Sequence, residues 1–187
     1  MAPKVKITRK EIVAAAIELV RQRGEMALNA RNIAASLDCS TQPIFSNFSS
    51  MEELRMAVIA QADKLCNQYI KDEVESGVYP AYKATGMAYI RFAKEECELF
   101  KLLYMRDRSQ EVVPKEMALD NEMEGLLHNN TGLAGAKAEL FHLEMWAFVH
   151  GIATMFATGF LNLDWDLVSK ILTDAYQGIK TQFKKEL

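Results

Sequence analysis

The sequence predicts an all-α protein, and three observations support that class. Only nine Gly and four Pro occur among the 187 residues, too few for the turns of a many-stranded β protein. Half of the residues are hydrophobic and a quarter are charged, which suits a globular chain with a substantial core. No segment shows the period-two alternation of a half-buried strand, whereas apolar residues recur at helical spacing.

Residues 8–37 are expected to form two helices. The capping box from Thr8 to Glu11 starts the first helix, and Gly24 ends it because glycine adopts a left-handed backbone most readily. Asn29 is expected to cap a second, short helix that runs to Leu37. Apolar residues in both helices recur three and four positions apart, so each helix presents one apolar face to a core.

A third short helix is expected after a turn at Asp38-Cys39. Ser40 is its expected N-cap, and the helix runs to about Asn47 with Pro43 in the first turn, where a missing N–H is tolerated. The second and third helices would then form a helix-turn-helix, which presents the start of the third helix to the major groove of DNA. An ordinary αα-hairpin is the alternative interpretation of this spacing.

Longer helices are expected in the rest of the chain. A second capping box at Ser50-Met51-Glu52-Glu53 and a proline at Pro80 each mark a helix start. The expected elements are a helix over 50–76, one over 80–105 that bends near 95–98, one from Pro114 to the breaker Asn129-Asn130-Thr131-Gly132, and two final helices over about 134–161 and 165–185.

Charge is unevenly distributed along the chain. Residues 1–50 hold seven Lys and Arg against four Asp and Glu, whereas the remaining 137 residues hold fifteen against twenty-one. A basic head on an acidic body indicates that the head meets a polyanion. The three cysteines are widely spaced, form no CxxC motif and follow no secretory leader, so we expect reduced thiols in a cytoplasmic protein.

Several short motifs occur in a fixed order between residues 9 and 55. They are Gly24 after the first helix, the pair Ile33-Ala34, Ser40, Ile44-Phe45 followed by Phe48, and the Ser50-x-Glu52-x-Leu54 start of the next helix. Together these motifs resemble the DNA-binding domain of tetracycline-repressor (TetR) family transcription regulators. The shorter motif Trp146-x-x-x-His150-Gly151 resembles the ligand-binding domain of one branch of that family.

The resemblance implies two domains, a helix-turn-helix DNA-binding domain over 1–50 and a helical effector-binding and dimerisation domain over 51–187. It also implies a homodimeric repressor that a small-molecule effector releases from double-stranded operator DNA. The residues expected to contact DNA are Lys4, Lys6, Arg9, Lys10, Asn29, Arg31, Ser40, Thr41, Gln42, Phe45, Ser46 and Asn47.

Several positions depart from the family pattern. Asp38 stands where the turn residue is usually Gly, Phe45 lacks the hydroxyl of a phosphate-contacting Tyr, and Met51 lacks the charge of a phosphate-contacting Lys. Losing such contacts weakens sequence-independent affinity and flattens its salt dependence, for which the basic N-terminal arm is expected to compensate. Asn47 replaces the common His and can donate to a phosphate. Arg31 lies where some relatives read a guanine, with a solvated surface arginine as the alternative.

An effector pocket is expected among the aromatic and methionine side chains of the middle and C-terminal helices. Met repacks easily, and Tyr, Trp and His combine an apolar body with a polar tip, which suits a small apolar or amphipathic ligand. Plain core packing is the alternative. The expected pocket residues are Tyr89, Phe92, Phe100, Tyr104, Met123, His142, Trp146 and His150.

The sequence contains no recognisable catalytic or metal-binding motif. His142 and His150 share a helical face, but no carboxylate or thiol stands at ligand spacing with them. A phosphate-binding loop, a nucleophile elbow and an HExxH motif are all absent. We therefore expect no enzyme activity, metal or cofactor. The alternative is a helical ligand-binding module, or an enzyme, that retains a degenerate DNA-binding head.

The last two helices are expected to form the interface of a homodimer. Residues 145–163 contain no charged side chain, yet their polar residues and acidic flanks disfavour a membrane span and favour burial between the core and a second subunit. The final helix offers the apolar stripe Val168, Ile171, Leu172, Ala175, Ile179 and Phe183, and the preceding helix offers the small residues Ala147, Gly151, Thr154 and Thr158.

Overall fold

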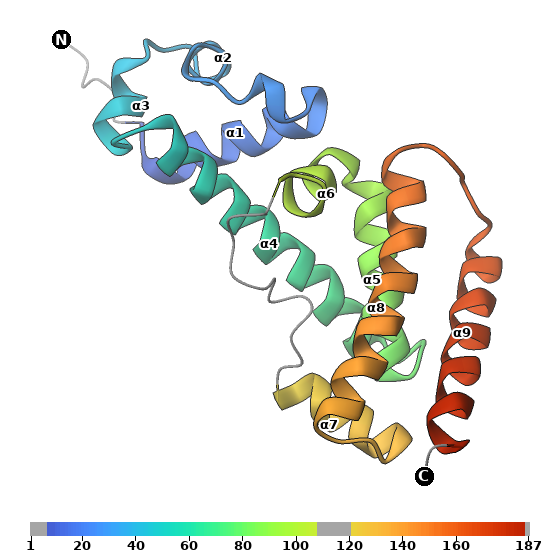
Figure 1. The fold of residues 1–187 in the computed structure, drawn as a ribbon. Helices are drawn as coiled ribbons and strands as arrows, with labels where there is room; N and C mark the ends of the chain where they lie inside the picture. Colours follow the sequence, from blue (N-terminus) through green and yellow to red (C-terminus); the bar gives the residue numbers. More distant parts are fainter. Residues whose placement is uncertain (1–6, 108–120, 186–187) are drawn as a thin grey trace. The chain divides into compact units, whose positions relative to one another are not determined.

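The computed structural model describes residues 7–107 and 121–185, and over these residues the regular structure is entirely helical, as predicted. The chain divides into two compact units (Figure 1). Unit 1 comprises Met1–Asn67 and Glu96–Arg106, and unit 2 comprises Gln68–Glu95 and Asp107–Leu187. The domain boundary at residues 50 and 51 remains a prediction.

Unit 1 is built around its first helix. The helix α1 (Arg9–Arg23) contacts η1 (Glu25–Ala27), α2 (Ala30–Ser36), α3 (Gln42–Asn47) and α6 (Cys97–Tyr104), and the first part of α4 (Met51–Ser76) completes the unit. Removing apolar surface from water stabilises this arrangement. The buried side chains of unit 1 include Ile12, Ala16, Val20, Ile33, Ile44, Phe48, Leu54 and Val58.

The predicted ends of the first two helices are confirmed. The Thr8 hydroxyl accepts from the Glu11 N–H, and the Glu11 carboxylate accepts from the Thr8 N–H, which completes the capping box. Gly24 ends α1 with a φ of 74°. Asn29 caps α2 by accepting from the Asn32 N–H at 3.0 Å.

Ser40 is not the N-cap of the third helix; Thr41 is, and it makes no side-chain capping bond. The physical reason is Pro43. A capping side chain normally bonds the second or third N–H of a helix, and the second is missing at proline. The third, on Ile44, donates to the Thr41 carbonyl at 3.2 Å. The predicted turn is confirmed, since Asp38 is left-handed with a φ of 49°.

The second capping box is only half formed. The Ser50 hydroxyl accepts from the Glu53 N–H at 3.1 Å, but the Glu53 carboxylate accepts from the N–H and hydroxyl of Ser49 rather than from Ser50. These bonds, with Arg9 beside them, lower the pKa of Glu53 to about 2. The predicted start of α4 is nevertheless correct.

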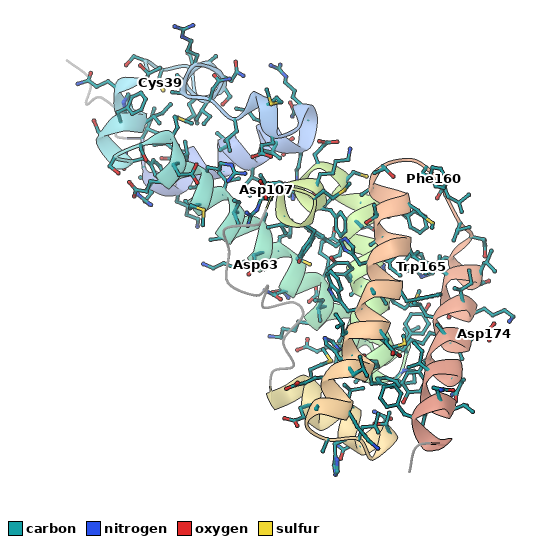
Figure 2. The ribbon with its side chains drawn as sticks, in the orientation of Figure 1. Cys39, Asp63, Asp107, Phe160, Trp165 and Asp174 are labelled. Carbon is teal, nitrogen blue, oxygen red and sulfur yellow. The ribbon has the colours of Figure 1, made fainter. Side chains whose placement is uncertain are left out.

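Unit 2 packs three long helices side by side (Figure 1). The helix α5 (Ala81–Glu95) contacts α7 (Asn121–Thr131), α8 (Ala136–Ala157) and α9 (Trp165–Lys185). Tyr82 bonds His142 and Tyr89 bonds His150, so α5 and α8 run parallel. Arg91 stacks over Trp165 at the start of α9, whereas Tyr82 meets Tyr176 further along it, so α9 is antiparallel to both (Figure 2).

The core of unit 2 is rich in aromatic side chains. The Phe141 ring lies 5.5 Å from the Tyr176 ring and 5.7 Å from the Phe183 ring, both edge to face, a geometry that aromatic pairs prefer. Four of the six residues of the predicted dimerisation stripe are therefore used inside the chain, since Ile179 also packs against this core. Val168, Leu172 and Phe183 are buried in the structure.

Several predicted ends in the second half differ slightly from the structure. The expected bend near 95–98 is confirmed as a break at Glu96 between α5 and α6. The helix α7 includes the first three residues of the predicted breaker and ends at Thr131, directly before Gly132 with its left-handed φ of 77°. The helix expected from Pro114 begins outside the described residues.

By length and composition, α8 could cross a membrane, with a mean hydropathy of 1.2 over its most apolar window. Nearly half of that window (44%) is buried inside the structure, where α8 contacts α5 and α9. The core helix of a water-soluble domain passes the same test of length and composition.

Candidate functional site

The outer face of α3 is the first candidate site. Gln42, Phe45 and Ser46 are exposed, while Ile44 and Phe48 on the other side are buried. Positions three and four apart share a helix face, so the three exposed side chains form one surface. No acidic residue occurs in α3, and Cys39 marks the turn that precedes it (Figure 2).

Two predicted DNA contacts are bonded within unit 1. The Arg9 guanidinium donates to the Asn47 carbonyl at 2.7 Å and to Glu53 at 2.8 Å, and it stacks 3.9 Å from the centre of the Phe48 ring. The Asn47 amide nitrogen donates to the carbonyls of Pro43 and Ile7. These two side chains hold the start of α1 against the end of α3.

The other predicted DNA contacts lie at the surface of unit 1 or outside the described residues. Ser46 donates its hydroxyl to the Gln42 carbonyl and keeps its lone pairs available as acceptors. Thr41 is partly buried. Lys10, Asn29, Arg31 and Ser40 are exposed, and Lys4 and Lys6 lie outside the described residues.

Paired Tyr and His side chains between α5 and α8 form the second candidate site. The Tyr89 hydroxyl and His150 Nδ1 are 3.0 Å apart, and the Tyr82 hydroxyl and His142 Nδ1 are 3.2 Å apart. Burial lowers the pKa of His150 and raises the pKa of Tyr82, so both groups are neutral at pH 7. His150 and Tyr82 can therefore form hydrogen bonds without carrying charge.

Trp146 lies next to the Tyr89–His150 pair. Its indole stacks on the His150 ring, with 4.7 Å between the ring centres and 8° between the planes. Trp146 Nε1 is buried and finds no acceptor among the described residues. A buried N–H without an acceptor in the protein is rare, and such groups commonly bond a water molecule or a ligand.

The remaining predicted pocket residues are divided between the two units. Phe92 is buried in unit 2 with its ring edge-on to Tyr69, and Met123 packs against the aromatic core of that unit. Phe100 and Tyr104 belong to unit 1, with ring centres 5.0 Å apart, and the Tyr104 hydroxyl donates to the Cys66 sulfur.

Sequence analysis did not include Tyr82 in the site, although the structure pairs it with His142. The signal was present in the spacing. Tyr82 and Tyr89 are seven residues apart, and His142 and His150 are eight apart, so each pair returns to one helix face after two turns. Such spacing places two side chains on one face of a helix, but it does not identify their partners on the other helix.

A pocket of about 280 Å³ lies within unit 1, apart from both candidate sites, and none of the eight predicted pocket residues lines it. Its lining residues are Glu25, Glu98, Lys101, Leu102, Met105 and Arg106. Among the described residues, no three His, Cys, Asp or Glu side chains are grouped so that they could hold a metal ion.

The fold and the two sites define a class, an all-α protein that joins a helix-turn-helix unit to a larger helical unit with two Tyr–His pairs between its helices. The sequence model described as the tetracyclin repressor-like C-terminal domain matches residues 82–175, half of the chain. The chain therefore belongs to the TetR family of transcriptional regulators, which are not enzymes. Its place in the Trp-x-x-x-His-Gly branch remains a prediction.

Solved structures show the same fold. A TetR-like transcriptional regulator from Rhodococcus sp. RHA1 is similar, with 17% identity, a TM-score of 0.69, and coverage of 96% of this chain and 98% of that one. A TetR family member from Streptomyces coelicolor A3 has 20% identity, a TM-score of 0.65 and coverage of 89% and 96%. The multidrug binding protein EbrR, complexed with imidazole, has 18% identity, a TM-score of 0.62 and coverage of 89% and 88%. No curated protein matches the chain.

Proposed function

We propose that this regulator binds operator DNA as a homodimer through α3 and represses transcription in the cytoplasm until a small neutral effector binds unit 2. The observation that carries the proposal is the outer face of α3, which is exposed, free of acidic residues and unnecessary to the core. The first turn of such a helix can reach base edges in a major groove.

The effector site is proposed around Trp146, His150 and Tyr89. Trp146 supplies a buried N–H without an acceptor among the described residues, and the Tyr89–His150 pair supplies a neutral polar wall. An acceptor atom on a planar, uncharged ligand would satisfy the N–H and avoid the desolvation of a charge. The effector releases DNA only if it binds the DNA-free conformation more tightly.

The dimer interface is proposed on the outward face of α8 and on α9. Leu140, Leu143 and Ala147 are exposed at helical spacing on α8, and the small residue Gly151 continues the same line. A methyl group added at Gly151 would meet no atom within 4 Å, so a second helix can approach closely there. Four more large apolar side chains of unit 2 are exposed, namely Phe148, Phe160, Leu161 and Leu167, and Phe160 lies in the connection between α8 and α9 (Figure 2).

DNA binding is tested by electrophoretic mobility shift with duplexes that flank the chain's own gene. Saturable binding to one duplex in excess random DNA is the expected result. A chain that binds none of them, or binds all of them equally, would not be a sequence-specific regulator. That outcome would favour the alternative, a helical ligand-binding module with a degenerate head.

Effector binding is tested by thermal unfolding, with imidazole at pH 8 as the first probe because the similar protein EbrR is described in complex with it. A ligand that binds the folded state raises the melting temperature with concentration. The expected response is lost in Trp146→Phe, which removes the N–H. It persists in Trp165→Phe, a matched variant at the chain's other tryptophan.

Dimerisation is tested by sedimentation at micromolar concentration. The wild type is expected to sediment as a dimer, and Leu143→Glu with Ala147→Glu as a folded monomer because two desolvated charges oppose association. Gln61→Glu, an exposed change on α4, is the control and should remain dimeric. A monomeric wild type would contradict the proposed interface.

A further inference from the structure

The outer face of α3 carries one large apolar side chain that the fold does not need. Phe45 is 53% exposed, whereas Ile44 and Phe48 beside it are buried and supply the apolar contacts of the helix. Gln42 is exposed one turn earlier on the same face. An exposed aromatic ring beside an exposed amide can be matched by particular chemical groups in the DNA major groove.

Phosphate is not that complement. Phe45 has no group that can donate to an anion, and Arg9 and Asn47, two predicted DNA contacts, are bonded within unit 1. Arg9 donates to Asn47 and Glu53, and Asn47 donates to Pro43 and Ile7. At Phe45 the exposed face of α3 is therefore suited to a base edge rather than to a phosphate.

Base edges offer two groups that match these side chains. The thymine C5-methyl group is the apolar feature of the major groove, and Phe is one of the side chains that contacts it. Adenine presents N7 as an acceptor and N6 as a donor, which a glutamine amide meets with two hydrogen bonds. Side chains three residues apart on a helix have Cβ atoms about 5–6 Å apart, so they reach neighbouring base pairs.

We propose that Phe45 is a specificity-determining residue that contacts a thymine methyl group, with Gln42 on an adenine of a neighbouring base pair. Each operator half-site then contains adjacent A·T pairs under α3. The inference rests on the proposed DNA-binding function and names the bases that the same site prefers.

The test uses the full chain and duplexes selected from a random-sequence library. Fluorescence anisotropy measures affinity for the selected duplex and for copies in which single thymines are replaced by uracil, which lacks the methyl group. One thymine per half-site is expected at which uracil weakens wild-type binding about three- to five-fold, the effect of one buried methyl group. Adenine replaced by 7-deazaadenine should weaken binding at the neighbouring pair.

Phe45→Ala is expected to bind the thymine duplex and the uracil duplex with equal affinity. That affinity should be no higher than the affinity of the wild type for the uracil duplex. The variant should fold normally because the ring is half exposed, and unchanged circular dichroism and melting temperature verify this. Met56→Ala removes an apolar side chain of similar exposure (51%) on α4 and should retain the full uracil effect.

The outcomes separate this inference from the proposed function. A chain that selects no specific duplex overturns both. A chain that binds a specific duplex, but shows no thymine at which uracil matters or keeps the uracil effect in Phe45→Ala, overturns the thymine contact and leaves the DNA-binding function intact. An effect of uracil that disappears only in Phe45→Ala supports the contact.

Discussion

Polar side chains are used differently in the two units. In unit 1 they lie mostly at the surface, where Thr8, Asn29 and Ser50 cap helices and Gln42 faces outward. In unit 2 the Tyr82–His142 and Tyr89–His150 pairs lie in the interior between α5 and α8. The first arrangement suits recognition of an extended polymer, and the second suits enclosure of a small molecule.

The largest expected effects come from the aromatic cores. Phe141→Ala in unit 2 and Phe48→Ala in unit 1 each remove a buried ring, so each should lower the free energy of unfolding by about 3–5 kcal/mol. Both tryptophans of the chain, Trp146 and Trp165, lie in unit 2, so their fluorescence reports on that unit alone.

Denaturant titration followed by fluorescence and by circular dichroism distinguishes these two variants. Phe141→Ala should shift the fluorescence midpoint, whereas Phe48→Ala should shift only part of the dichroism transition. Coincident transitions in both variants would show that the two units unfold together, and would contradict the expectation that each unit unfolds separately.

DNA binding distinguishes the surface of unit 1 from the rest of the chain. Gln42→Ala should weaken binding to the cognate site by about 1–3 kcal/mol and have little effect on random DNA. Deleting residues 2–7, which contain Lys4 and Lys6, should weaken binding to all sequences and reduce the salt dependence. Equal losses on cognate and random DNA for Gln42→Ala would mean that this residue does not contact bases.

Two helical glycines of unit 2 test how closely its helices pack. A methyl group at Gly86 would lie 3.2 Å from Val149 Cγ2, whereas one at Gly151 would meet nothing within 4 Å. Gly86→Ala should lower the free energy of unfolding by about 0–2 kcal/mol, since overpacking outweighs the gain in helix propensity. Gly151→Ala should raise it by up to about 1 kcal/mol. Thermal unfolding compares the two variants, and equal responses would contradict the close α5–α8 contact.

The smallest expected effect is on pH dependence. Burial lowers the pKa of His150 below 6.5, so as the pH falls below 6.5 the unfolded chain takes up a proton before the folded chain does. Unit 2 therefore loses stability from that pH downward, until the pH passes the pKa in the folded state. His150→Gln should reduce this loss in the tryptophan fluorescence transition between pH 7 and 5. If the stability of His150→Gln falls with pH as steeply as that of the wild type, the loss of stability comes from other titratable groups.

The low pKa of Glu53, about 2, acts in a lower range. Its contribution to unit 1 is present above the unfolded value of 4.5 and declines as the pH falls toward 2. Circular dichroism of Glu53→Gln should show less acid sensitivity than the wild type in that range. The two units therefore respond to acid at different pH values.

Most of unit 1 could be predicted from sequence because its helix ends are set by local interactions. The Thr8–Glu11 box, Asn29 and Asp38 act within a few residues, and each was found where predicted. The prediction of Ser40 as an N-cap was wrong because Pro43 lacks an N–H that a capping side chain would bond. General cap preferences do not take this missing donor into account.

Unit 2 was less predictable because its contacts join distant residues. Spacing placed His142 and His150 on one helix face, but no local pattern specified Tyr82 and Tyr89 as partners some sixty residues away. The stripe on α9 was correctly identified as apolar, and yet Val168, Leu172 and Phe183 are buried in the chain's own core. Periodicity shows that a face is buried without showing what covers it.

The parallel pairing of α5 and α8 has a consequence for synthesis on the ribosome. Tyr82 and Tyr89 meet partners 60 and 61 residues later in the chain, so α5 cannot be covered until α8 has been made. At translation rates of about 5–20 residues per second, that delay is roughly 3–12 s. During this interval the face of α5 that α8 later covers, with Tyr82, Gly86 and Tyr89, is exposed on the nascent chain, which makes it the segment where a chaperone is expected to bind.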